Sequence, residues 1–104
     1  MLTLRPNCEL CDADLPPESP DARICTYECT YCARCVETVL LDVCPTCGGN
    51  FATRPIRPKN AWRDGLNLGL GFHPASSERR HSKWTAQQIQ ELTTRLKRIN
   101  PTER

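Results

Sequence analysis

The chain has few of the residues that build an ordinary hydrophobic core. Its 104 residues include two Trp, two Tyr, two Phe and one Met, and hydrophobic residues make up 38% of the total. A piece of about 50 residues buries too little apolar surface to offset its loss of chain entropy without a cross-link or a metal ion. The sequence therefore predicts a small domain with appendages that apolar packing alone does not hold together.

Long apolar runs are also absent. No stretch approaches the roughly 18 consecutive apolar residues that a membrane-spanning helix needs. The first ten residues, MLTLRPNCEL, contain no basic segment followed by an apolar one, so no signal peptide is visible. We therefore expect a cytoplasmic protein without a membrane partner, in a compartment that keeps thiols reduced.

Cysteine is what the sequence has in excess, and all eight cysteines lie between residues 8 and 47. They form four pairs: Cys8/Cys11, Cys25/Cys29, Cys32/Cys35 and Cys44/Cys47. Two thiolates at such a spacing can bind one ion at about 2.3 Å each. A tetrahedral Zn²⁺ takes four ligands, so the eight thiolates suit two Zn²⁺ ions. Disulfides are the alternative cross-link, and an iron–sulfur cluster is the alternative cofactor.

The spacing allows two ways of dividing the eight ligands. A sequential scheme assigns to one ion Cys8, Cys11, Cys25 and Cys29, and to the other Cys32, Cys35, Cys44 and Cys47. An interleaved scheme assigns to site 1 Cys8, Cys11, Cys32 and Cys35, and to site 2 Cys25, Cys29, Cys44 and Cys47. Spacing alone does not decide between them.

The residues between the cysteines resemble those of the RING-finger family, from Cys8 to about Gly48. The pattern is C-x2-C, a long loop, C-x3-C, C-x2-C, a short helix and C-P-x-C. Tyr31 before Cys32 and Val36 after Cys35 also agree. The resemblance implies that residues 1–50 form a RING-like, treble-clef α+β module whose two zinc sites share their ligands in the interleaved way.

The match to RING fingers has departures that bear on activity. Cys29 stands where these domains usually have a His. Leu10 and Pro45 fit the surface through which ubiquitin-ligase RING fingers dock a conjugating enzyme, but the helix lacks a Trp and Gly48 replaces a basic residue. The segments PNCELCDADLPP, DARICTYECTYC and HPAS also resemble a small uncharacterised bacterial family of cysteine-rich proteins.

Charge divides the chain into two halves. Residues 1–50 carry three basic and eight acidic side chains, a formal charge of −5, and residues 51–104 carry eleven basic and four acidic ones, a charge of +7. A basic tail with an aromatic side chain can follow a phosphate backbone. The candidate contacts are Arg54, Arg57, Lys59, Arg79, Arg80, Lys83 and Arg98. The competing interpretation is that residues 51–83 are a linker whose Ile56 and Trp62 cover the module.

Periodicity predicts three regular segments. Residues 36–43 have apolar side chains at Val36, Val39, Leu40 and Val43, one face of a short helix. Residues 66–72 alternate apolar with Asn or Gly, which predicts an extended segment lying on the module. Residues 84–100 read as an amphipathic helix with a capping box at Thr85 and Gln88 and a stripe at Ile89, Leu92, Leu96 and Ile99.

The remaining candidates point away from catalysis. His73 and His81 are read as surface residues, since eight cysteines already complete two sites. No cysteine is left beside a His base, and sites with four thiolates have no open position for a substrate. We expect a non-enzymatic interaction or regulatory protein with a protein partner, a monomer or a homodimer through the C-terminal helix. The alternatives are a nucleic-acid-binding zinc protein and a ubiquitin-ligase-like enzyme.

Overall fold

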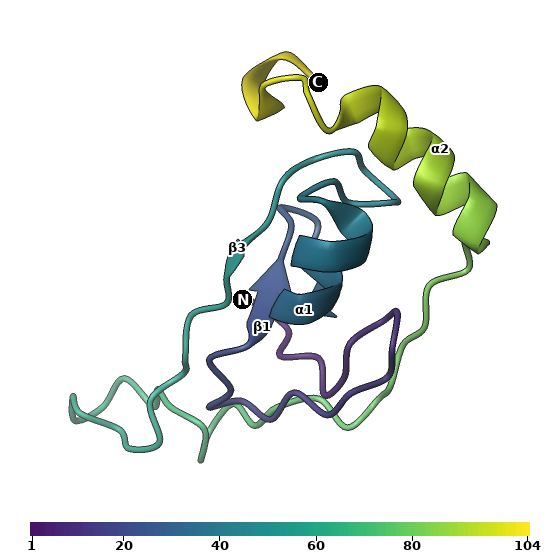
Figure 1. Ribbon diagram of the computed structural model, residues 1–104. Coiled ribbons are helices and arrows are strands. Elements are labelled where there is room, and N and C mark those ends of the chain that lie inside the picture. The colour runs from purple at the N-terminus through teal and green to yellow at the C-terminus, as the bar shows by residue number, and fades with distance from the viewer.

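Three short antiparallel strands form the sheet of the computed structural model, which describes residues 1–104. They are β1 (Ala22–Ile24), β2 (Thr30–Cys32) and β3 (Ala52–Thr53), in the order β2–β1–β3. Arg23 of β1 pairs with Tyr31 on one side and Thr53 on the other. The sheet joins the segment that carries the first three cysteine pairs to the chain that follows the last pair (Figure 1).

The central helix begins earlier and ends earlier than the expected range of 36–43. It consists of α1 (Ala33–Cys35) and a wider π-helical turn, η1 (Val36–Leu40). A π turn spaces its hydrogen bonds five residues apart, and this changes which side chains share a face. Val36 and Leu40 are buried, but Val39 is 47% exposed, so its expected place in the core is wrong. Leu41 and Asp42 have positive φ and stop the helix.

The core beneath this helix is small and rich in sulfur. Five of its twelve clustered residues are cysteines. The rings of Tyr31 and Phe51 meet edge to face, with centroids 5.5 Å apart. Leu4, Leu15 and Leu40 are almost fully buried. The thiols therefore occupy positions that larger apolar side chains fill in ordinary domains.

Helix α2 (Ala86–Leu96) is the longest element, and its capping box is confirmed. Thr85 accepts from the Gln88 N–H, and the Gln88 side chain accepts from the Thr85 N–H. The helix ends at Leu96, four residues before the expected boundary, and a 3-10 turn, η2 (Pro101–Glu103), follows. Neither α2 nor the central helix is long and apolar enough to cross a bilayer.

Helix α2 packs on the module of its own chain (Figure 1). Ile89 is 3% exposed, and the Thr93 hydroxyl donates to the Leu40 carbonyl at 3.4 Å. The Trp84 indole N–H donates to the Thr46 hydroxyl at 3.0 Å. These contacts place the apolar side of α2 against the central helix and the last cysteine pair.

Residues 66–72 do not form the expected extended segment, and their side chains do not enlarge the core. The N–H groups of Phe72 and His73 both donate to the Gly69 carbonyl, so the chain turns there. Asn67 and Gly69 have positive φ, which breaks the alternation that a strand requires. Trp62 is 79% exposed, so the expectation that it and Ile56 cover the module is also wrong.

Candidate metal centres

One group of four thiols joins the first cysteine pair to the third. The sulfur atoms of Cys8, Cys11, Cys32 and Cys35 all lie within 4.8 Å of one another. The Cys11 and Cys32 sulfurs are 3.7 Å apart. Four thiolates about 2.3 Å from a tetrahedral ion lie about 3.8 Å from each other. The group therefore has approximately the dimensions of a four-thiolate site.

Local backbone geometry positions these four sulfurs. In the first pair, the Cys11 N–H points at the Cys8 sulfur, at 3.5 Å. In the third pair, β2 ends at Cys32 and the first turn of α1 brings the Cys35 N–H to the Cys32 sulfur, also at 3.5 Å. Backbone N–H groups directed at sulfur favour the thiolate form, which is the form that binds metal.

The second group contains Cys25, Cys44 and Cys47, whose sulfurs also lie within 4.8 Å of one another. The Gly49 N–H donates to the Cys47 sulfur at 3.3 Å, and the Gly48 N–H donates to the Cys44 carbonyl. Gly48 has a φ of +78°, and a Cβ there would lie 3.0 Å from the Leu96 side chain. Glycine makes this exit turn without the strain that a side chain would bring at positive φ.

Cys29 lies beside the second group but outside its 4.8 Å limit. Its carbonyl accepts from the Cys25 N–H at 3.3 Å, and its thiol neighbours those of Cys25 and Cys44. The turn that leads to it includes Glu28 at a φ of +66°. Cys29 thus lies near the second group without belonging to it.

In both groups the pKa of some thiols is raised, which favours their protonated form until a cation displaces the protons. Burial raises the pKa of Cys25 to about 11, and the charge of Cys44 adds to the effect. Burial also raises the pKa of Cys35. The neighbouring Cys29 thiol and then burial raise the pKa of Cys44. Thiolates are metal ligands, so a divalent cation must compete with these protons.

In space the first pair lies with the third, and Cys25 of the second pair lies with the fourth pair. This donor set fits zinc and also fits iron, both of which accept four thiolates. A bound Zn²⁺ would supply structural cross-linking and no open coordination position. His73 and His81 belong to neither group, and the His81 Nε2 lies 2.9 Å from the Asp12 carboxylate.

Three of the seven basic side chains expected to contact phosphate are held by the protein itself. Arg54 is 1% exposed and donates to the carbonyls of Arg5, Leu15 and Pro16. Arg57 donates to the carbonyls of Leu2 and His73. Arg79 is paired with Asp12 and Asp14. Arg54 therefore belongs to the core, and the expectation that it contacts nucleic acid is wrong.

Sequence reasoning missed Asn7 and Glu9, which attach distant segments to the first cysteine pair. The Glu9 carboxylate accepts from the Thr30 N–H at 2.6 Å. Asn7 is fully buried and pairs with the backbone of Arg80. Asn7 directly precedes Cys8, but nothing in its sequence neighbourhood indicates a partner 73 residues away.

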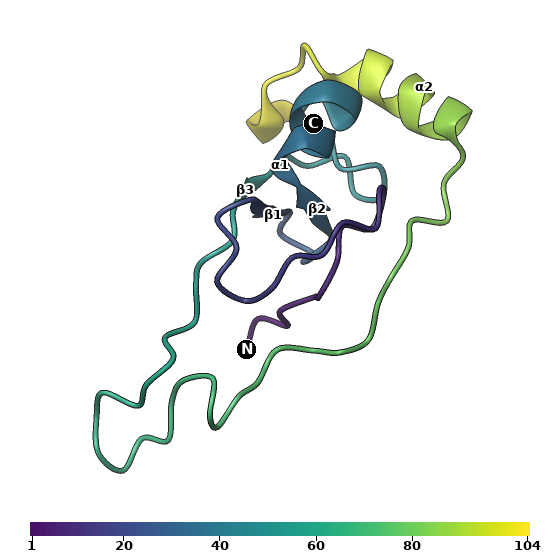
Figure 2. The same ribbon diagram turned by 60° about the horizontal axis from the view of Figure 1, so that its bottom comes forward.

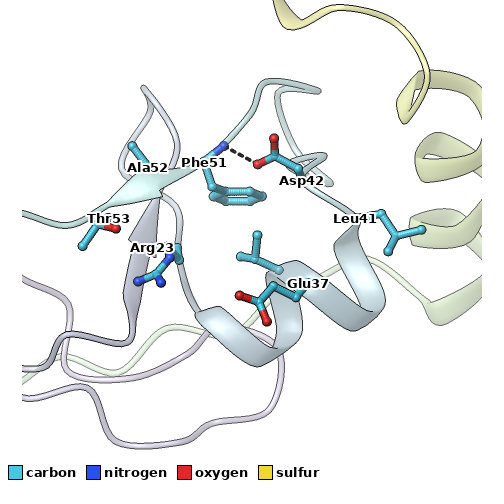
Figure 3. A pocket seen from close by; sticks show the side chains of 8 residues that line it. Arg23, Glu37, Leu41, Asp42, Phe51, Ala52 and Thr53 are labelled. Carbon is cyan, nitrogen blue, oxygen red and sulfur yellow. Dashed lines mark hydrogen bonds between the residues drawn. The ribbon is translucent and has the colours of Figure 1, made fainter.

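A hollow of about 590 Å³ lies between the central helix and strands β1 and β3 (Figure 3). Phe51 lines it, and its backbone N–H donates to the Asp42 carboxylate at 2.9 Å. Arg23 and Glu37 also line it, but the Arg23 guanidinium donates to the carbonyls of Pro20 and Ala22. No cysteine or histidine lines this hollow, so it is separate from both thiol groups.

Comparison with known proteins places these features in a family. The model of DUF1272, described as a protein of unknown function, matches residues 1–57. A protein of Rhizobium meliloti (strain 1021), called "Uncharacterized protein R02474", is 54% identical over 79 residues, which cover 76% of this chain and 84% of that protein. No solved structure matches the chain.

Proposed function

Because the chain belongs to the DUF1272 family, and because the matched region holds all eight cysteines, we propose that it is a zinc-binding, non-enzymatic interaction protein. Its module is RING-like, with two Zn²⁺ ions held in an interleaved arrangement. Site 1 consists of Cys8, Cys11, Cys32 and Cys35, and site 2 consists of Cys25, Cys29, Cys44 and Cys47. The observation that carries this proposal is the interleaved grouping of the sulfurs.

The interleaved arrangement would explain how a module with so small a core has a stable fold. Each ion would connect a cysteine pair to the pair after the next one in the chain, so the two sites overlap in sequence and fold as one unit. Both sites use thiolates only and are closed to substrates, which supports a structural role for the metals. Recognition of a protein partner then falls to the surface that the metals hold in shape.

The position of α2 argues against a ubiquitin-ligase-like activity. Leu10 and Pro45 are the residues that resemble a conjugating-enzyme docking surface. Leu10 lines one groove with Trp84 and Ile89 of the α2 region, and Pro45 lines another with Trp84 and Leu92. The chain's own helix therefore borders both residues, and a partner docking there has to displace it.

Metal analysis of the purified full chain tests the proposal. We expect two Zn²⁺ per chain and no visible absorption. Cys8→Ser should remove one ion and Cys44→Ser the other, because each variant breaks a different group. Thr26→Ala is the matched control, since Thr26 is an exposed residue between Cys25 and Cys29 and lies in neither group.

Three results would overturn it. A brown protein that contains iron would show that the thiols bind an iron–sulfur cluster and not zinc. Native mass spectra in which the sulfurs are bonded to one another would show that disulfides, and not metal ions, cross-link the module. Loss of both ions together in a variant that still folds, judged by amide chemical shifts, would contradict two separate sites.

A further inference from the structure

Half of the large hydrophobic side chains that the protein exposes lie in one segment, residues 56–72, here called the apolar loop. They are Ile56, Trp62, Leu66, Leu68 and Phe72, each more than half exposed. The molecule measures 48 × 27 × 18 Å, and the apolar loop projects at the end far from α2 (Figure 2). The exposed apolar surface is therefore concentrated on a projecting tip.

The apolar loop is tied at its base. The Leu70 N–H donates to the Pro58 carbonyl at 2.9 Å, closing the loop between these residues. Gly69 has a φ of +108°, and a Cβ there would lie 3.0 Å from the Asn60 carbonyl oxygen, so this closure requires glycine. The Arg57 guanidinium connects the carbonyls of Leu2 and His73 beneath the closed ring. Loops closed in this way are frequently functional.

The charge of the apolar loop is positive. It contains Arg57, Lys59 and Arg63 and one acidic residue, Asp64. None of these takes part in the ion pairs of the structure, which involve Arg79, His81, Asp12 and Asp14. Lys59 and Arg63 are exposed and flank Trp62 in the sequence. Cations therefore lie close in the sequence to the most exposed aromatic side chain.

From this arrangement we propose that the apolar loop docks the protein on a membrane surface that contains anionic phospholipids. Trp and Leu side chains enter the boundary between headgroups and acyl chains, while neighbouring Lys and Arg contact the phosphates. The protein then lies on the bilayer without crossing it. From the sequence alone we expect no membrane contact, because the sequence predicts that these side chains pack against the module.

The shape of the tip favours a membrane over a protein groove. Five hollows of the structure are lined by residues outside 56–72, whereas the loop presents its large apolar side chains to solvent. A convex tip with apolar residues and flanking cations matches a deformable anionic surface in both shape and charge. The acidic first half of the chain would stay away from the lipid, which orients the molecule tip first.

Vesicle flotation with the metal-loaded full chain tests this proposal. We expect binding to vesicles of equal parts phosphatidylcholine and phosphatidylglycerol, and much weaker binding to phosphatidylcholine alone. The pair Trp62→Ala and Leu66→Ser, and the pair Lys59→Glu and Arg63→Glu, should each weaken binding about tenfold or more. Tyr27→Ala and Lys97→Glu are the matched controls, since both side chains are exposed outside the loop.

Fluorescence adds a readout that electrostatic adhesion alone would not change. The emission of Trp62 should shift to shorter wavelength on binding, and the shift should disappear in Trp62→Phe while flotation persists. No flotation with anionic vesicles, or equal flotation of the charge-reversed variant, would overturn the proposal. So would self-association of the chain that Leu66→Ser abolishes, because the tip would then bind a second copy. Zinc content measured on the same samples separates these outcomes from failure of the metal sites.

Discussion

The side chain of Asn7 pairs with the backbone of Arg80 as a neighbouring strand would. Its amide donates to the Arg80 carbonyl at 2.7 Å and accepts from the Arg80 N–H at 3.1 Å. Two residues later, the Ser82 N–H donates to the Glu9 carbonyl at 2.7 Å. The chain that leads into α2 is therefore fixed directly to the first cysteine pair, and a metal ion bound there would be coupled to the position of the tail.

Replacing Asn7 by Ala should loosen this attachment. The partly buried N–H and carbonyl of Arg80 would lose their partners, at a cost of about 1 kcal/mol or more in the free energy of unfolding. Chemical denaturation of the metal-loaded protein measures the loss, and hydrogen exchange should become faster at the Arg80 and Ser82 amides. Asn60→Ala, at an exposed position, is the control. Unchanged exchange at both amides would refute the coupling.

Arg54 should matter for stability and not for nucleic-acid binding. Its guanidinium holds three backbone carbonyls together in the core, and burial lowers its pKa. Arg54→Ala should cost about 3 kcal/mol or more, because charged hydrogen bonds are lost and carbonyls are left unpaired. Lys59→Ala, at an exposed cation, should cost little. If Arg54→Ala instead left stability intact and weakened binding to RNA or DNA, the assignment to the core would fail.

Ile89 should anchor α2 to the module. It is buried against the core cluster, so Ile89→Ala should cost about 2–5 kcal/mol from lost burial and the cavity that remains. Gln90→Ala, on the neighbouring exposed position, should have little effect. Thermal unfolding followed by circular dichroism compares the two. Equal melting temperatures would mean that α2 does not pack as the structure shows.

Removing the metal with a chelator should abolish helix α2 as well as the module. A helix of 11 residues is marginal in water on its own, and α2 depends on packing against the central helix and the last cysteine pair. The far-ultraviolet helix signal should therefore fall together with the near-ultraviolet signal of Tyr31 and Trp84. A chelated protein that kept its full helix signal would show that α2 folds independently.

Acid should release the metal. Burial raises the pKa of Cys25 to about 11 and also raises that of Cys35, so the compact form without metal prefers protonated thiols. Protons thus compete with the cation, and zinc affinity should increase steeply between about pH 6 and about pH 8. Competition with a coloured chelator measures the slope. A flat profile across this range would contradict thiolate ligation.

Short-range patterns of the sequence were informative wherever the deciding residues lie close together in the chain. The close spacing within a cysteine pair predicted that its two thiols can share one ion, and in the structure both thiols of the first pair and both of the third lie in one group. The capping box at Thr85 and Gln88 was also correct, because its hydrogen bonds span only three residues. The metal proposal itself follows from these local spacings together with the number of cysteines.

Local periodicity failed where the backbone departs from a regular repeat. Residues 66–72 alternate like a strand, but positive φ at Asn67 and Gly69 turns the chain and leaves Leu66 and Leu68 in solvent. Val39 is exposed because a π turn, which no residue pattern indicated, replaces the regular helix. Both errors concern side chains whose direction depends on backbone angles.

The sequence by itself determined the donor chemistry: eight thiols in four pairs, in a chain too poor in apolar residues to fold on packing alone. Only the tertiary structure decided which pairs meet, where Arg54 and Asn7 lie, and that α2 covers its own module while the apolar loop is left exposed. The reason is physical. Turn and cap geometry depends on neighbours a few residues away, whereas burial and charge pairing depend on segments up to 73 residues apart.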